Sequence, residues 1–147
     1  MKLLVASDHA GYPLKEALLQ EIGSQHAYQV EDLGPPNAQP VDYPDYAHAL
    51  SVRLLQDAEN SLGVLICGTG IGMSMAANRH HGVRAALCTD PYMATMARMH
   101  NNANVLCLGA RIVGQGLAQA ILAAFLEGRF DGGRHATRVA KIDNKQP

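Results

Sequence analysis

A glycine-rich loop follows an apolar run and a single cysteine at residues 65–74, LICGTGIGMS. Glycines let the backbone approach a ligand closely, and the amides at the start of a helix can bind an anion. The same helix terminus favours the thiolate form of a nearby cysteine. A thiolate at Cys67, beside an anion pocket formed by Gly68, Gly70 and Gly72, could support acyl transfer or proton abstraction next to a carbonyl.

Other interpretations of this loop stay open. A dinucleotide-binding fingerprint needs G-x-G-x-x-G, and here the third glycine comes one residue early, although Asp90 falls where a ribose-binding acid could lie. A phosphate-binding P-loop is disfavoured because no Gly-Lys-Ser/Thr follows. The simplest structural interpretation is a strand-to-helix turn that needs only small residues.

Two further segments place a histidine beside a polar residue. In SDHAG, Asp8 and His9 follow the first apolar run, which suggests proton handling or anion binding. Asp8 could instead cap the next helix. In MHNNAN, His100 and Asn101 lie at a predicted helix end, where a histidine can also act only as a favourable charge for the helix dipole.

The segment GGRHATRV spaces Arg134 and Arg138 four residues apart, so both side chains project from one face of a helix. Paired guanidinium groups offer forked donors to a phosphate or a carboxylate, whereas a solvated basic tail is the structural alternative. The seven histidines form no H-E-x-x-H or related set, so the sequence predicts no metal site.

Strand-like apolar runs alternate with helical periods along the whole chain. This alternation predicts an α/β fold, a parallel sheet between helix layers, in one domain spanning residues 1–147. Ligands of such sheets bind beyond the carboxyl ends of the strands, and the proline-rich loop 34–44 is long enough to contribute. The predicted strands are 2–7, 28–33, 62–67, 82–88 and 104–109; the predicted helices are 13–22, 45–58, 72–79, 91–100, 115–127 and a last one from about 134.

Composition excludes several classes of function. The 147 residues carry a net charge of −1, and only seven are aromatic, which argues against nucleic acid or an anionic membrane as a partner. The first apolar run is too short for a signal peptide or a membrane span, so a cytoplasmic protein is expected. Cys88 and Cys107 are expected to be buried, reduced thiols.

Taken together, SDHAGYPLK, DYPDYA, LICGTGIGMSMAANR, RAALCTDPYMA, HNNANVLCLGAR and GGRHATRV resemble the B-type ribose-5-phosphate isomerases. The superfamily also contains allose-6-phosphate and galactose-6-phosphate isomerases, and the resemblance covers about residues 2–142. It implies a Rossmann-like three-layer fold with a five-stranded parallel sheet. It also implies a homodimer or a dimer of dimers, with active sites between subunits and no metal or organic cofactor.

For the reaction, the resemblance implies interconversion of an aldose phosphate and a ketose phosphate through a cis-enediolate. Cys67 would be the base that moves the proton between C1 and C2, and amides from Gly68 to Gly72 would hold the enediolate oxygen. Thr69 would assist at the sugar oxygens, and Asp8 would shuttle protons among the hydroxyls. Some members place a glutamate base at the position of Met73 instead, so this chain resembles the cysteine type.

The resemblance also assigns substrate-binding roles. His100 would open the furanose ring, Asn101 would bind the open chain, and Tyr43 would line the substrate. The phosphate would be held by His9, Arg111, Arg134 and Arg138. The leading hypothesis is therefore a ribose-5-phosphate isomerase; the alternatives are an isomerase of a six-carbon sugar phosphate and a non-catalytic nucleotide-binding module.

Overall fold

The structure is a computed structural model that describes residues 1–25 and 28–143. Five parallel strands form one sheet in the order β2-β1-β3-β5-β4. The strands are β1 (Lys2–Ser7), β2 (Gln29–Asp32), β3 (Ser61–Cys67), β4 (Ala85–Leu87) and β5 (Val105–Gly109). The helices are α1 (Tyr12–Gln25), α2 (Tyr43–Leu55), α3 (Ile71–Ala77), α4 (Pro91–Asn101), α5 (Gln115–Glu127) and α6 (Arg134–Asp143).

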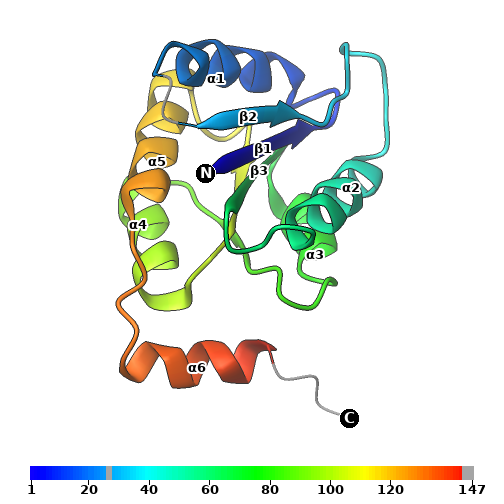
Figure 1. The fold of residues 1–147 in the computed structure, drawn as a ribbon. Helices are drawn as coiled ribbons and strands as arrows, with labels where there is room; N and C mark the ends of the chain where they lie inside the picture. The colour runs from blue at the N-terminus through cyan, green and yellow to red at the C-terminus, as the bar shows by residue number, and fades with distance from the viewer. Residues whose placement is uncertain (26–27, 144–147) are drawn as a thin grey trace.

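Helices cover both faces of the sheet, as Figure 1 shows. Helices α1, α4 and α5 lie on one face, and α2 and α3 lie on the other. Successive strand side chains point to opposite faces, so β3 sends Val64 and Ile66 toward the first group of helices and Leu65 and Cys67 toward the second. The predicted three-layer α/β fold with a parallel five-stranded sheet is confirmed.

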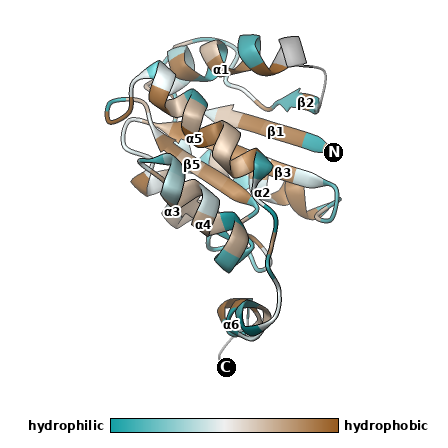
Figure 2. Ribbon diagram, turned by 90° about the vertical axis from the view of Figure 1, so that its left-hand side faces the viewer, coloured by the Kyte–Doolittle hydropathy of each residue, from teal (hydrophilic) through white to brown (hydrophobic). Residues whose placement is uncertain are grey.

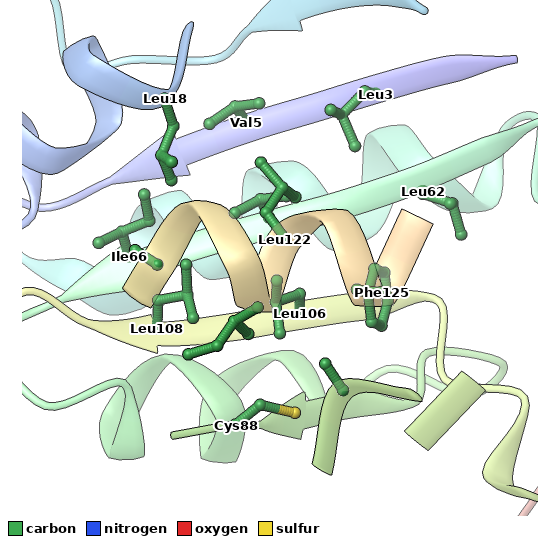
Figure 3. Close-up of a cluster of buried hydrophobic side chains, with 14 of the residues drawn as sticks. Leu3, Val5, Leu18, Leu62, Ile66, Cys88, Leu106, Leu108, Leu122 and Phe125 are labelled. Atoms are coloured by element: carbon green, nitrogen blue, oxygen red, sulfur yellow. The ribbon is translucent and has the colours of Figure 1, made fainter. Parts of the chain in front are cut away.

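The larger core lies between the sheet and helix α5 (Figure 3). Leu122 and Phe125 of α5 pack over Leu106 and Leu108 of β5 and belong to the same buried cluster. Burial of each such side chain contributes about 1.5–3 kcal/mol. This packing holds the central strands in place. The strands in turn position the loops that follow their carboxyl ends.

Most observed bounds lie within two residues of the predicted ones, and the larger differences are at the end of α1, the end of α2 and the start of β4. Helix α2 begins at Tyr43, inside the predicted proline-rich loop, because extended Asp42 precedes it and Pro44 suits its first turn. Strand β4 begins only at Ala85, since the N–H of Arg84 donates to the side chain of Asn104 at 2.8 Å and not to a neighbouring strand.

The start of the proline-rich loop is anchored by a buried lysine. The Lys15 side chain of α1 is fully buried, and its ammonium lies 2.5 Å from Asp32 at the end of β2. The second carboxylate oxygen of Asp32 accepts the N–H of Gly34 at 2.9 Å, and the Gly34 carbonyl accepts the N–H of Ser7 at 3.0 Å. A buried charge needs such a partner, so this pair fixes where the loop leaves the sheet.

Helix α6 stands apart from the three layers. It lies beyond the lower end of the sheet in Figure 1 and is mostly hydrophilic in Figure 2. Its buried residues are His135 and Val139, and it contacts α4. None of the helices in the described part of the chain is both long and apolar enough to span a membrane.

Candidate active site

Cys67 is the last residue of β3 and lies where the strand meets the glycine-rich loop. Its residue is 5% exposed, and its sulfur accepts the N–H of Gly70 at 3.1 Å. A backbone donor directed at the sulfur stabilises negative charge on it. The sulfur is thus held at the start of the loop by a backbone donor.

The glycine-rich loop leads from that sulfur into the first turn of α3. Gly70 has φ 77°, and a Cβ there would lie 2.5 Å from the side chain of Leu87, so only glycine fits without strain. The N–H of Ser74 donates to the Gly70 carbonyl at 3.0 Å. The amides of Gly72 and Met73 precede that bond in the first turn of α3, where no intrahelical acceptor is available. Amides of this kind at the start of a helix can donate to an oxyanion.

Tyr43 and Thr69 border the same loop. The Tyr43 ring lies against Gly72 so closely that a Cβ there would be 2.6 Å from the ring. Tyr43 is 40% exposed, and Thr69 is exposed as well, with its hydroxyl accepting the N–H of Ile71 at 3.3 Å. Both side chains can therefore reach a ligand above the loop.

Asp8 lies next to Cys67, because the Asp8 N–H donates to the carbonyl of Ile66 at 3.0 Å. One carboxylate oxygen of Asp8 accepts the N–H of Gly11 at 2.8 Å, just before α1 begins. This bond closes the turn that precedes α1 and holds Asp8 at the edge of the sheet, but it satisfies no N–H of the helix itself. The neighbouring His9 places Nδ1 3.3 Å from the backbone N and O of Val41, which joins the end of β1 to the proline-rich loop.

The turn after β5 brings Arg111 over the glycine loop. The N–H of Ala110 donates to the Cys67 carbonyl at 2.8 Å, and the N–H of Arg111 donates to the Gly68 carbonyl at 3.0 Å. A Cβ on Gly68 would lie 3.4 Å from Arg111 Nη1. The predicted residues gathered at this edge of the sheet are Asp8, His9, Tyr43, Cys67, Gly68, Thr69, Gly70, Gly72 and Arg111.

Four predicted residues lie elsewhere. His100 and Asn101 end α4, and Arg134 and Arg138 belong to α6. Helix α4 runs about 15 Å back toward the opposite edge of the sheet. The chain then enters β5 where the carbonyl of Asn104 accepts the N–H of Gly63, about 13 Å before Cys67 along β3. Within one chain, these residues and Cys67 occupy opposite edges.

His135, to which the sequence analysis assigned no role, stacks on His100. The ring centroids are 4.2 Å apart and the ring planes differ by 5°. His100, Asp131 and His135 offer potential metal-ligand atoms within 4.8 Å of one another. Lone pairs of ring nitrogens lie in the ring planes, however, so two parallel rings cannot both direct one at the same ion. The only sequence signal for this contact is the adjacency of His135 to Arg134.

The other two cysteines are chemically distinct from Cys67. Both are buried free thiols, as predicted. Burial, with a smaller effect of Asp90, raises the pKa of Cys88 to about 11, and burial raises the pKa of Cys107 further. Neither thiol forms thiolate near neutral pH, so proton abstraction cannot be assigned to them.

Met73 occupies the position at which the resemblance places a glutamate base in other members. Its side chain is fully buried, in the core cluster that also contains Cys67. A thioether cannot accept a proton at neutral pH, so Met73 contributes packing and its backbone amide.

A thiol followed by the first turn of a helix, at the carboxyl edge of a parallel sheet, is typical of an enzyme of the α/β class. The chain matches the model of the Ribose/Galactose Isomerase family over residues 3–142. It is 40% identical to ribose-5-phosphate isomerase B of Escherichia coli over 141 residues, which is 96% of this chain and 93% of that protein.

Solved structures agree with this match. A ribose 5-phosphate isomerase from Thermotoga maritima superposes with a TM-score of 0.91 at 48% identity, covering 97% of both chains. Ribose-5-phosphate isomerase B from Mycoplasma genitalium, solved with bound ribulose-5-phosphate, gives a TM-score of 0.93 at 41% identity, covering 97% of this chain and 93% of that one. This chain belongs to the ribose/galactose isomerase family.

Proposed function

We propose that this chain is an aldose–ketose isomerase that interconverts ribose 5-phosphate and ribulose 5-phosphate. The observation that carries the proposal is the Cys67 sulfur, which lies 3.1 Å from the Gly70 amide and beside the first turn of α3. Proton abstraction next to a carbonyl needs a base and donors for the developing oxyanion, and this loop supplies both. Relatives that carry the name of this activity support the choice of substrate.

In the proposed mechanism, the Cys67 thiolate removes the proton from C2 of the open-chain aldose. The C2–H electrons form the C1–C2 double bond, and the former carbonyl oxygen O1 becomes the enediolate oxygen held by the amides of Gly72 and Met73. The Cys67 thiol then returns its proton to C1, while a proton passes from O2 to O1 and C2 becomes the carbonyl. No atom is gained or lost, and Asp8, which neighbours Cys67 at the edge of the sheet, would carry the hydroxyl proton.

The surrounding side chains would hold the substrate over this loop. Thr69 and Tyr43 are exposed beside it and would contact sugar oxygens. The Arg111 guanidinium over Gly68 and the His9 ring at the loop edge would bind the phosphate together with the arginines of α6. Phosphate bound away from the reacting carbons keeps the sugar in register.

We further propose that the working enzyme is a dimer in which His100, Asn101, Arg134 and Arg138 of one copy complete the loop of the other. Support comes from the placement of these residues at the edge of the sheet opposite Cys67. It also comes from exposed apolar side chains beside the loop, including Ile71 and Met75 of α3, Tyr92 of α4 and Ile112. A second copy would cover this surface and finish the site.

The test is turnover of ribose 5-phosphate, allose 6-phosphate and galactose 6-phosphate by the purified protein, with and without a chelator. We expect the highest kcat/KM on ribose 5-phosphate and no loss with the chelator. A preference for a six-carbon phosphate would assign the chain to the galactose branch of the ribose/galactose isomerase family. Loss of turnover with the chelator would contradict the proposed chemistry, and tight nucleotide binding without turnover would favour a binding module.

A further inference from the structure

His135 is a buried polar side chain that the proposed reaction leaves unused. It is 8% exposed, and its ring lies parallel to that of His100 at a centroid distance of 4.2 Å. His100 itself is partly exposed in the last turn of α4. One face of the His100 ring is therefore covered by His135, while the residue remains accessible to solvent.

The connection between α5 and α6 is built to produce this stack. The N–H of Asp131 donates to the Met99 carbonyl at 3.0 Å, which joins the connection to the last turn of α4. Gly132 and Gly133 follow with φ 65° and 54°, values that favour glycine, and the N–H of His135 donates to the Gly132 carbonyl at 3.0 Å. Together these contacts direct the first turn of α6 onto the end of α4.

The charges around His135 favour its neutral form. Burial lowers its pKa first, and the neighbouring His100, Arg134 and Arg138 lower it further, while Asp131 has a smaller opposite effect. A neutral ring adds no second positive charge beside His100. A neutral His135 ring can therefore keep the His100 ring in one orientation without repelling a positive charge on it.

We propose that His135 is a positioning residue that holds the His100 imidazole for opening of the furanose ring; this rests on the isomerase function proposed above. In ring opening the C1–O4 bond breaks, O4 takes up a proton, and the C1 hydroxyl gives up its proton as C1 becomes a carbonyl. The proton balance is zero, and His100 carries one of these transfers. Because proton transfer depends on the direction of the donor and acceptor, a freely rotating ring would slow this step.

The proposal can be tested because ring opening and enolisation are separable. Ribose 5-phosphate is mostly a closed furanose and must open before the proton at C2 can be removed. Ribulose 5-phosphate stays open, because its C5 oxygen carries the phosphate and cannot close onto C2. Deuterium exchange at C1 of ribulose 5-phosphate therefore needs Cys67 but not ring opening, whereas turnover of ribose 5-phosphate needs both.

Three variants measured in both assays distinguish positioning from structural support. His135→Ala removes the stacked ring, and we expect kcat on ribose 5-phosphate to fall about tenfold or more while deuterium exchange stays within about twofold of wild type. His135→Phe keeps a flat ring and should recover most of that kcat. Val139→Ala is the matched control, since Val139 is the other buried residue of α6. In this variant, turnover of ribose 5-phosphate should fall no more than deuterium exchange of ribulose 5-phosphate.

Several results would overturn the proposal. Equal losses in both assays for His135→Ala would show that His135 only supports the fold. A His135→Phe variant as slow as His135→Ala would exclude ring stacking as the cause, and a selective loss of ring opening in Val139→Ala would assign the effect to docking of α6. A wild-type protein that neither turns over ribose 5-phosphate nor exchanges ribulose 5-phosphate would refute the proposed function itself.

Discussion

The loops at the carboxyl edge of the sheet and the corner formed by α4 and α6 are built in different ways. Cys67 and its loop are fixed by backbone hydrogen bonds to Ala110 and Arg111 and by a fully buried central strand. The corner is held by two buried side chains of α6, by one backbone bond from the preceding connection to α4, and by an ion pair of 2.9 Å between Asp143 of α6 and Arg84. The fold thus fixes the position of Cys67, the proposed base, through the central sheet. Two of the arginines proposed to bind the phosphate lie instead on α6, outside the three layers.

The largest expected effect is at the carboxyl edge. Cys67→Ala removes the proposed base while leaving the loop backbone intact, and we expect kcat to fall about 10²–10⁴-fold, the usual contribution of a positioned base. Deuterium exchange at C1 of ribulose 5-phosphate should be lost to the same extent. Cys88→Ala, which removes a thiol whose pKa is raised by burial, is the control and should keep its activity. Retained exchange in Cys67→Ala would exclude the cysteine base.

Mixing two inactive variants tests whether Cys67 of one subunit and His100 of another subunit belong to the same active site. Cys67→Ala and His100→Ala should each be nearly inactive. In a mixed dimer, one site would contain both mutations and the other none. Random mixing makes half of the dimers mixed, so we expect activity to recover to about a quarter of wild type. Recovery should require subunit exchange, for instance brief exposure to mild denaturant, and mixtures that stay inactive after verified exchange would contradict a shared site.

A smaller effect is expected at the α6 arginines. Arg134→Ala and Arg138→Ala each remove forked donors to the phosphate, and we expect KM to rise about 10–100-fold, because a charged hydrogen bond contributes about 1.5–3 kcal/mol. Lys141→Ala, on the same helix and exposed, is the control. An unchanged KM in both arginine variants would indicate a solvated basic tail.

The smallest expected effect is on stability in acid. The pKa of His135 is lowered in the folded protein by burial and by nearby cations, so the unfolded chain binds the proton more readily. The free energy of unfolding should therefore decrease as the pH falls below about 6.5, the ordinary pKa of histidine. His135→Phe should weaken this dependence in thermal unfolding measured from pH 7 to pH 5. An equal dependence in both proteins would assign it to other groups.

The sequence was sufficient to predict the parallel sheet and to predict which residues lie at its carboxyl edge. Apolar runs marked the strands, and Asp8, Cys67 and Arg111 each lie at a strand end or within two residues of one. Tyr43 was predicted within the loop, although Pro44 in the following position is a signal for the helix that begins there. The roles assigned to these side chains stay predictions.

The sequence did not reveal the contact between His100 and His135. The two residues are separated by the whole of β5 and α5, and their stacking depends on how two glycines turn the chain onto α4. No periodicity marks such a contact, because it depends on tertiary structure. The parallel geometry of the rings, which argues against shared metal ligation, is likewise visible only in the structure.

The position of α6 outside the three layers has a consequence for how substrate preference can change during evolution. A longer sugar phosphate moves the phosphate away from the carbons that exchange protons, and the proposed grip would have to follow it. Because α6 lies outside the three layers and is docked by His135, Val139 and the ion pair between Asp143 and Arg84, small changes at these contacts can shift the α6 arginines. The core beneath Cys67 need not be repacked, so one catalytic loop can serve substrates of different chain length.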